Sequence, residues 1–423
     1  MEEVISLNHK CSRPLKILIL SQWFKPEPVY IPTTLARQLS GMGHEVQVLT
    51  GYPNYPSGKL EPGYKIRLYR IEKENDVKII RVPLYPSHDY SSIKRSINYA
   101  SFALAAATIG VLLADKPDVV YVYYPPSTLF LPAMVMKYIW GVPLLFNIQD
   151  IWPDAIMATG MLRNSAWARA IEAMERVSRR IASHIITISP GFKGKLVERG
   201  VSPDKISVIY NWCDDSVIQP AEGCEGIAED LGLNGKFIVT YAGNIGKAQA
   251  LDTILEVAAI LEDRRPDFLF VFVGGGVDSK RLAVKAKQMG LGNTMFMDRM
   301  LASEVAKILS ISDVLLVHLR DEPLFKITIP SKTQAYMAIG KPILMAVRGD
   351  AASLVEYAGA GISCIPEDKD SIVNALERFF MMTEEERIEM GRSGRIYYQE
   401  NLALNIAAER VVDICYRLIE ENM

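Results

Sequence analysis

Lysines and prolines near the start of a helical pattern suggest a phosphate site in the second half of the sequence. An apolar run of strand length, Asp313–Leu319, leads towards Pro330, Ser331 and Lys332, after which the helical pattern begins. The start of a helix offers backbone N–H groups and the positive end of the helix dipole. With an ammonium group beside it, this junction predicts an anion site. The alternative is an ordinary capped helix with a solvated lysine.

Two glycine-bearing turns occur in the same half of the chain. The first, GNIGKAQA, begins at Gly243 after the strand-like run 237–242, and the second begins at Gly274 after the run 268–273. Glycine lets the backbone approach a bound group closely. Together with the turn that contains Lys332, these turns make Lys247 and Lys332 candidates for holding a diphosphate.

A carboxylate follows a buried strand in the first half of the sequence. The run 143–148 is apolar and leads directly into Asp150. Ligands of α/β sheets bind beyond the carboxyl ends of the strands. Asp150 could accept a proton from a hydroxyl or stabilise a developing positive charge. Alternatively it caps the next helix, a role that Asp154 could also fill.

Aromatic residues gather in loops that follow other strands. The loop 51–64 is dense in Tyr, Pro and Gly, and Tyr124 follows the strand-like run 119–123. Tyrosine and tryptophan offer flat apolar faces with a polar tip, which suits a sugar. A structural loop without a ligand is the alternative. The candidates for contact with an acceptor are Asn54, Tyr55, Tyr124 and Trp152.

The elements that must position these residues alternate between strand and helix. A strand at 15–20, a helix at 33–42 and a strand at 45–50 begin a parallel sheet with right-handed crossovers. The alternation restarts at 237, so we predict an α/β fold with two domains and a boundary at 213–221. The first loop lacks the GxGxxG pattern, which argues against a nicotinamide cofactor.

Composition excludes some classes of function. The 423 residues carry a net charge of −2, which gives no electrostatic case for binding nucleic acid. The five cysteines lack any CxxC spacing, so we interpret them as reduced thiols with no metal site. The N-terminus has no apolar segment typical of a secretion signal, and a cytoplasmic protein is expected.

Two segments suggest contact with a membrane surface. Residues 98–114 carry no charge and follow Lys94 and Arg95, while 163–183 forms an amphipathic pattern with several arginines. The segment 94–114 is either a buried core helix or an apolar helix that touches the inner membrane. The segment 163–183 is either a solvated basic face or an electrostatic contact with anionic lipid.

Several motifs together resemble the retaining glycosyltransferases of family 4. They include GHEVQVLTG, QDIWPDAIMATG, YAGNIGKAQALDTILE, VFVGGG and FKITIPSKTQAYMAIGKP, within residues 15–415. The sequence is most similar to the bacterial branch with L-fucosamine and colanic-acid-type transferases. This resemblance implies the GT-B fold, with two Rossmann-like parallel-sheet domains facing a central cleft. It divides the chain into 1–213, 214–400 and a helix at 401–423 that returns to the first domain.

The resemblance also implies a hexosyltransferase activity. The second domain would hold a nucleoside-diphosphate sugar as substrate, such as UDP-N-acetyl-L-fucosamine. The first would offer a lipid-linked saccharide acceptor in O-antigen, capsule or exopolysaccharide biosynthesis. No metal or other cofactor is expected, because lysines and helix N-termini can stabilise the departing diphosphate.

Site residues follow from the same resemblance. Asp150, Lys247 and Lys332 are the expected catalytic residues. The expected donor-binding residues are Gly243, Asn244, Gly246, Gly274, Gly275, Arg299, Lys326, Thr328, Pro330 and Ser331.

The sequence departs from the family pattern at several positions. Ile327 and Ala335 stand where the family usually has two glutamates, the second of which meets the ribose. Asn244 and Gln249 replace a phosphate-binding arginine and lysine, leaving Lys247 as a shifted substitute. Two other functions therefore stay open. One is a GT-B-type sugar-nucleotide epimerase, and the other is a catalytically weak scaffold subunit.

Overall fold

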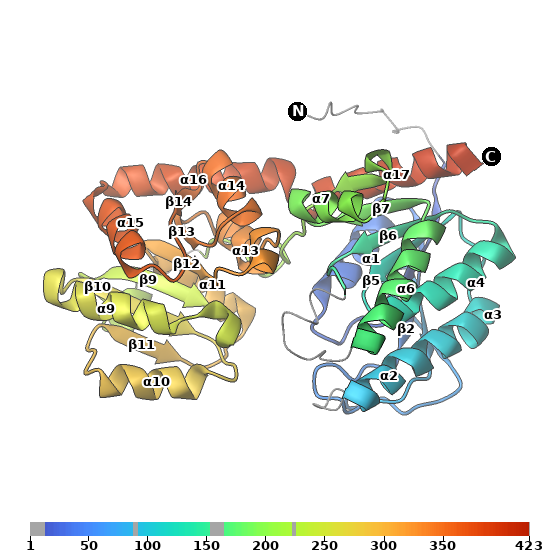
Figure 1. Cartoon of the computed structure of the whole chain (residues 1–423), viewed down its shortest axis with the longest axis horizontal. Coiled ribbons are helices and arrows are strands. Elements are labelled where there is room, and N and C mark those ends of the chain that lie inside the picture. Colours follow the sequence, from blue (N-terminus) through green and yellow to red (C-terminus); the bar gives the residue numbers. More distant parts are fainter. Residues whose placement is uncertain (1–12, 88–91, 153–164, 222–225, 423) are drawn as a thin grey trace. The chain divides into compact units, whose positions relative to one another are not determined.

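The chain folds into two compact units, each built on a mainly parallel sheet (Figure 1). The computed structural model describes residues 13–87, 92–152, 165–221 and 226–422. The first unit comprises Met1–Ile188, Phe192–Tyr210 and Ala407–Met423, and the second comprises Ser189–Gly191 and Asn211–Ile406. The predicted α/β class is confirmed in both units.

The first unit contains an eight-stranded sheet in the order β3-β4-β2-β1-β5-β6-β7-β8. Its pairs are parallel except for β3 with β4. The central strands are apolar because helices cover both of their faces. The strands are β1 (Lys16–Leu20), β2 (Glu45–Gly51), β3 (Arg70–Glu74), β4 (Val77–Val82), β5 (Val119–Tyr124), β6 (Leu144–Ile148), β7 (His184–Thr187) and β8 (Ile206–Val208).

In this unit helix α4 packs against α2 and also against α6 (Figure 1). The helix α17 joins the same unit, where Tyr416 donates a hydrogen bond of 2.8 Å to the carbonyl of Arg13. The helices are α1 (Tyr30–Gly41), α2 (Ser92–Ala105), the π-helical η1 (Ala106–Gly110), α3 (Val111–Leu113), η2 (Ser127–Leu129), α4 (Phe130–Trp140), α6 (Ser165–Ile181), α7 (Pro190–Glu198), η3 (Pro203–Lys205) and α17 (Leu404–Asn422).

The apolar segment 98–114 forms part of the core on one side. Phe102 and Ala106 are fully buried. The helical stretch Ile93–Leu113 has a mean hydropathy of 1.6, and by length and composition it could cross a membrane. Only 39% of its apolar window is buried, so the helix packs on the core while a second face stays open.

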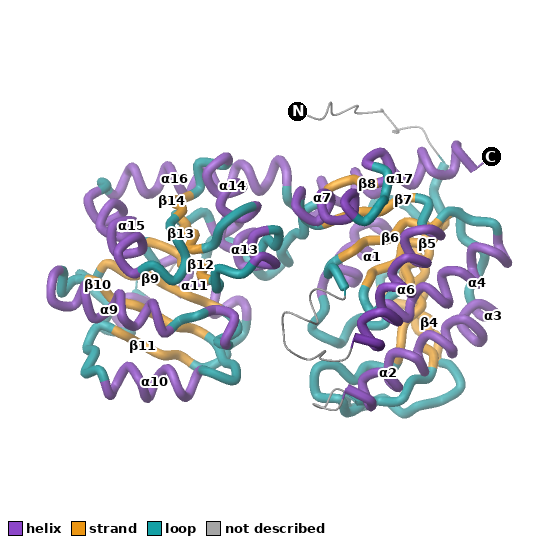
Figure 2. The backbone as a smooth tube through the Cα atoms, in the orientation of Figure 1, coloured by secondary structure: helices purple, strands orange, loops and turns teal. Residues whose placement is uncertain are grey.

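The second unit contains a six-stranded parallel sheet in the order β11-β10-β9-β12-β13-β14 (Figure 2). Its strands are β9 (Phe237–Ala242), β10 (Phe268–Val273), β11 (Thr294–Met297), β12 (Val314–His318), β13 (Ile343–Ala346) and β14 (Gly361–Ser363). Its helices are α8 (Ile227–Asp230), η4 (Lys247–Gln249), α9 (Asp252–Arg264), α10 (Ser279–Gln288), α11 (Ala302–Ile311), α12 (Pro323–Lys326), α13 (Ser331–Ile339), α14 (Asp350–Tyr357), α15 (Lys369–Met381) and α16 (Glu384–Asn401).

Candidate functional site

The two glycine turns of the second unit pack directly against each other at the carboxyl ends of β9 and β10. The amide of Gly243 donates to the carbonyl of Val273 at 2.8 Å, and that of Ile245 donates to Gly275 at 3.0 Å. Gly274 has a φ of +135°, and a Cβ there would lie 2.0 Å from the carbonyl oxygen of Gly243. Glycine is therefore needed at Gly274 for close backbone packing, which fixes the shape of both turns.

Lys332 links the start of α13 to the first of these turns. Its Nζ donates to the hydroxyl of Tyr241 at 3.0 Å and to the carbonyl of Ala242 at 3.1 Å. It also lies 4.3 Å from the centroid of the Tyr241 ring, within the range of a cation–π contact. A Cβ on Gly243 would lie 2.5 Å from this Nζ. The segment that contains Lys332 and the glycine turn that begins at Gly243 are thus in contact, as the sequence predicted.

Burial lowers the pKa of the Lys332 ammonium to about 8. Its two hydrogen-bond partners, a hydroxyl and a carbonyl, are uncharged, so neither compensates the desolvated charge. A bound anion would provide that compensation.

The start of α13 differs in detail from the prediction. Pro330 is the N-cap residue, Ser331 is the first helical residue, and no side chain caps the helix. Ser331 therefore lies inside the helix and does not cap it. The helix N-terminus next to Lys332 carries no side-chain acceptor of its own, which favours an external anion.

Lys247 lines a different pocket of about 310 Å³, and Lys332 is not among its lining residues. Both acidic and basic side chains line this pocket. Arg281 forms ion pairs with Asp252 at 2.6 Å and Asp278 at 3.1 Å, and these contacts hold the pKa of both carboxyls below the usual range. The structure thus does not bring the two lysines into one described pocket.

The other expected donor residues separate into two groups. Arg299 lies beside the second glycine turn, since a Cβ on Gly275 would lie 3.3 Å from its Nε. Lys326 instead forms an ion pair with Asp321 at 3.3 Å, and Thr328 donates to the carbonyl of Leu324 at 2.8 Å. Arg299 is therefore placed to contact a ligand at the turn, while Lys326 and Thr328 have local partners.

The first glycine turn is held internally by the residues that replace the family's basic pair. Gln249 accepts a hydrogen bond of 3.0 Å from the amide of Gly246. The carbonyl of Asn244 accepts a hydrogen bond of 2.5 Å from Tyr241. Gln249 thus shapes the turn, and the Lys332 ammonium contacts the residue before it.

In the first unit, Asp150 follows the carboxyl end of β6, as predicted. Its side chain reaches the surface, yet the surrounding protein removes enough water to raise the pKa of its carboxyl to about 6. The alternative capping residue, Asp154, lies outside the described residues.

A row of aromatic rings in this unit joins residues of three loops and of helix α2. Ring centroids are 5.7 Å apart for Trp23 and Tyr55, 6.2 Å for Trp23 and Tyr99, and 6.5 Å for Tyr99 and Trp152. Two predicted acceptor residues, Tyr55 and Trp152, thus belong to one aromatic row. Trp23 and Tyr99 were not predicted, because the sequence alone does not show which segments the fold places side by side.

Two predicted acceptor residues are corrected by the structure. Tyr124 is fully buried, and its hydroxyl donates to Glu175 at 2.7 Å. Asn54 is also buried, with its amide nitrogen donating to the carbonyl of Tyr52 at 3.0 Å. Both side chains are used inside the unit, so neither is open to an acceptor.

Sequence reasoning missed Glu27, a buried carboxylate that organises the first loop. It accepts backbone hydrogen bonds from Phe24 at 3.1 Å and from Asn54 and Tyr55 at 2.8 Å each. Burial raises the pKa of its carboxyl to about 7, against the effect of these three donors. Glu27 therefore ties two loops together and positions the Tyr55 end of the aromatic row.

Family models match both units of the chain. The glycosyl transferase 4-like domain matches residues 30–212, and glycosyl transferases group 1 matches residues 225–396.

Among the residues that the structure describes, no cluster of three or more His, Cys, Asp or Glu side chains could hold a metal ion.

Individual proteins are similar over most of the chain. The colanic acid biosynthesis glycosyl transferase WcaI of Escherichia coli K12 is 26% identical over 92% of this chain and 98% of its own. The glycosyltransferase WbjE of Pseudomonas aeruginosa is 23% identical over 73% of this chain and 77% of its own. Anabaena HepE in complex with UDP has a TM-score of 0.71 at 15% identity, covering 95% of this chain and 100% of HepE.

Proposed function

This chain is a glycosyltransferase of the GT-B fold with a glycosyl transferase 4-like domain and a group 1 domain, and from this premise we propose its reaction. It transfers a sugar from a UDP-sugar to a lipid-linked saccharide in surface-polysaccharide biosynthesis, with retention of the anomeric configuration. UDP-N-acetyl-L-fucosamine is the first donor to test, because the motifs resemble the L-fucosamine branch. The name of WcaI supports a role in polysaccharide biosynthesis. The HepE complex with UDP supports UDP as the nucleotide of the donor.

The observation that carries this proposal is the position of Lys332. Its ammonium lies at the start of α13 and contacts the backbone of the Gly243 turn through Ala242. Breaking the bond between sugar and diphosphate leaves negative charge on the diphosphate. A fixed ammonium and a helix N-terminus stabilise that charge as it develops. The Lys332 ammonium and the N-terminus of α13 would therefore stabilise the diphosphate without a metal ion.

The acceptor is assigned to the first unit. Asp150 would receive the proton of the acceptor hydroxyl or stabilise positive charge on the sugar ring. A carboxyl with a pKa near 6 is largely ionised at neutral pH and can still take up a proton. The aromatic row from Tyr55 to Trp152 would offer flat faces to the sugars of the acceptor.

Contact with a membrane belongs to the same proposal, because a lipid-linked acceptor lies at a membrane surface. Ile93, Ile97, Leu104 and Leu112 are exposed on the α2–α3 stretch. Positions 93, 97 and 104 share one face of a helix. The π-helical turn η1 adds one residue, so Leu112 returns to that face after about five turns. Lys94 and Arg95 beside this face suit anionic headgroups.

A thermal-shift titration with UDP, GDP, dTDP and ADP tests the donor site. UDP at 100 times its Kd is expected to stabilise the protein by roughly 2.7 kcal/mol. In Lys332→Ala the shift caused by UDP should be lost or strongly reduced, because the diphosphate loses its ammonium partner. Lys326→Ala is the matched control. Its ion pair with Asp321 is local, so the UDP shift should remain.

Transfer is tested separately from binding. Release of UDP from the UDP-sugar should require a lipid-linked saccharide acceptor. If UDP binds but no acceptor preparation promotes its release, the chain is a scaffold that kept its nucleotide site. If no nucleotide stabilises the protein, the donor assignment is wrong.

A further inference from the structure

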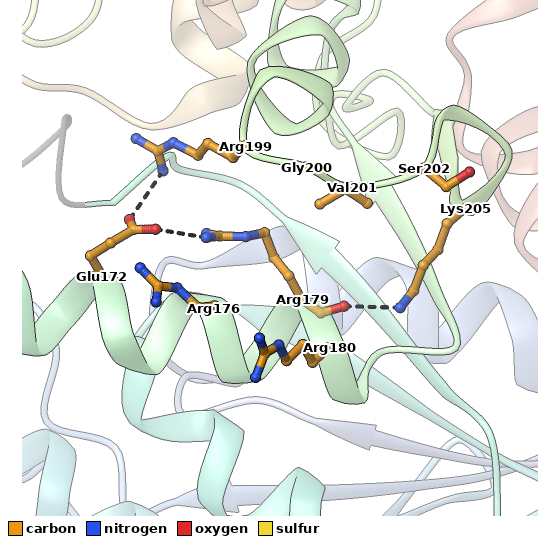
Figure 3. A pocket seen from close by; sticks show the side chains of 9 residues that line it. All are labelled: Glu172, Arg176, Arg179, Arg180, Arg199, Gly200, Val201, Ser202 and Lys205. Atoms are coloured by element: carbon orange, nitrogen blue, oxygen red, sulfur yellow. Dashed lines mark hydrogen bonds and ion pairs between the residues drawn. The ribbon is translucent and has the colours of Figure 1, made fainter.

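A pocket of about 550 Å³ in the first unit is surrounded by basic side chains (Figure 3). Three of them come from α6, and two come from the segment that follows α7. We call it the arginine pocket, and its charged lining residues are Arg176, Arg179, Arg180, Arg199, Lys205 and Glu172. Five cations face one carboxylate, which leaves an excess of four positive charges (5 − 1).

The arginine pocket contains a buried guanidinium that is only partly satisfied. The Arg179 side chain is 7% exposed, and its Nη2 donates to Glu172 at 2.7 Å. Its Nη1 is buried and has no hydrogen-bond partner among the described residues. A buried hydrogen-bond donor without a partner destabilises the folded protein, and the cost in free energy is larger when the donor is charged. The unsatisfied Nη1 therefore favours an acceptor in the pocket.

Two further cations of the arginine pocket are held in place by backbone carbonyls. Lys205 donates to the carbonyl of Arg179 at 2.9 Å, and Arg199 donates to the carbonyl of Trp152 at 2.8 Å. The carbonyl acceptor fixes the position of Lys205 without neutralising its charge, whereas Arg199 also pairs with Glu172 at 3.8 Å. Arg176 and Arg180 are exposed along the same side of α6 (Figure 3). Glu172, which Arg179 and Arg199 share, is the single acidic side chain lining the described pocket.

We propose that the arginine pocket binds a phosphate or diphosphate group. Guanidinium groups match the geometry of phosphate oxygens through paired N–H donors. The phosphate group can come from two sources, the headgroup of a lipid or a soluble phosphorylated compound. Assigning it to the lipid-linked acceptor rests on the proposed function, whereas the anion site itself stands on the pocket alone.

The first test measures binding of inorganic pyrophosphate to the full chain by calorimetry. The experiment uses the Lys332→Ala variant, so that the proposed donor site does not contribute to the measured pyrophosphate binding. Pyrophosphate should bind, and the additional pair Arg176→Gln and Arg180→Gln should weaken binding ~10-fold or more. Both arginines are exposed, so the fold should be retained. Arg169→Gln, an exposed position on the same helix outside the pocket lining, is the matched control and should bind as its parent does.

A second variant adds charge instead of removing it. Ser202 is exposed and lines the pocket, so Ser202→Glu introduces a carboxylate without breaking the Arg179 contacts. It should abolish pyrophosphate binding. Absence of binding to the Lys332→Ala chain would overturn the proposal. So would binding that survives both the double substitution and Ser202→Glu.

The source of the phosphate is decided with vesicles of phosphatidylglycerol. If pyrophosphate competes with the vesicles, and the double variant Arg176→Gln, Arg180→Gln no longer binds the vesicles, the site takes a lipid headgroup. If pyrophosphate binds in the pocket while vesicle binding is unchanged by these substitutions, the ligand is a soluble phosphorylated compound. Either result supports the anion site and is independent of UDP binding.

Discussion

Lys332 and Asp150 are both ionisable groups whose charged forms the surrounding protein disfavours. Loss of surrounding water brings the pKa of Lys332 down to about 8 and that of Asp150 up to about 6. In both cases the charged form has lost part of its hydration. A ligand that supplies the opposite charge would restore what was lost. The two groups are thus suited to respond to a substrate.

The lowered pKa of Lys332 predicts a pH dependence of UDP affinity. Below pH 8 the free protein already carries the ammonium, so affinity should change little. Above pH 8 the lysine is mostly neutral and binding must first protonate it. Affinity should therefore fall by up to about tenfold per pH unit. Titrations of UDP between pH 7 and 9.5 measure this effect.

Lys332→Arg provides the control for this pH dependence. The guanidinium stays charged throughout the range, so the decline between pH 8 and 9.5 should flatten. An equal decline in both proteins would mean that another group controls the affinity.

At the scale of elements, the two glycine turns form a single structural unit through their backbone contact. The close approach of Gly274 to the Gly243 carbonyl leaves no room for a side chain. Lys332 also contacts the Gly243 turn, since a Cβ on Gly243 would lie 2.5 Å from its Nζ. A displacement of either turn should therefore move the ammonium of Lys332 relative to its neighbours.

Gly274→Ala tests this coupling. The added methyl group would lie 2.0 Å from a carbonyl oxygen and would also require a positive φ. We expect a loss of roughly 3 kcal/mol or more in unfolding free energy, together with loss of the UDP shift. Chemical denaturation and thermal-shift assays measure the two effects.

Gly290→Ala separates the backbone effect from the steric one. Gly290 has a φ of +73°, and a Cβ at this position would meet no atom within 4 Å. The substitution should cost only about 1 kcal/mol and leave UDP binding intact. Equal behaviour of the two variants would contradict a special role for the packed turns.

The sequence allowed prediction of the elements that are long and apolar, and of little beyond them. Buried parallel strands such as β1 and β9 are continuous apolar runs, so they were recognised. The strands β3, β11 and β14 were missed: β3 is polar and mostly exposed, β11 is only half-buried, and both β3 and β14, like β11, lie at an edge of their sheet. Short or exposed strands depend on their neighbours, which local patterns do not reveal.

The candidate site was predictable to a similar extent. Lys332 was recognised because a strand, a proline and a helix start are local signals. Tyr124 was assigned wrongly because successive strand residues face opposite sides of the sheet, and this one faces the α6 layer and Glu175. Glu27 was missed because its donors include Asn54 and Tyr55, whose proximity depends on the folded loops.

At the scale of the whole molecule, the exposed face of the α2–α3 stretch is an apolar surface that the fold leaves open. Leu104 is 58% exposed and Leu112 is 86% exposed. The opposite face of the same helical stretch is anchored by Phe102 and Ala106 in the core. Substitutions on the open face should consequently affect contacts with other surfaces without weakening the core.

Leu104→Ser combined with Leu112→Ser should reduce co-sedimentation with phosphatidylglycerol vesicles about tenfold or more, since each leucine loses favourable transfer out of water. The thermal midpoint should stay within a degree or two, because both side chains are already exposed. Leu301→Ser, 71% exposed in the second unit, is the control. Unchanged sedimentation of the double variant would remove the membrane assignment.

The return of α17 to the first unit has a consequence for synthesis of the protein. Val411 and Cys415 of this helix are buried, and Tyr416 reaches the backbone of Arg13. The ribosome completes the whole of residues 211–406 before it makes the helix that finishes the first unit. At ordinary translation rates of about 5–20 residues per second, that interval lasts roughly 10–40 seconds. During it, the nascent first unit keeps apolar surface uncovered and is open to chaperones, and its native state is reached only after α17 has emerged from the ribosome.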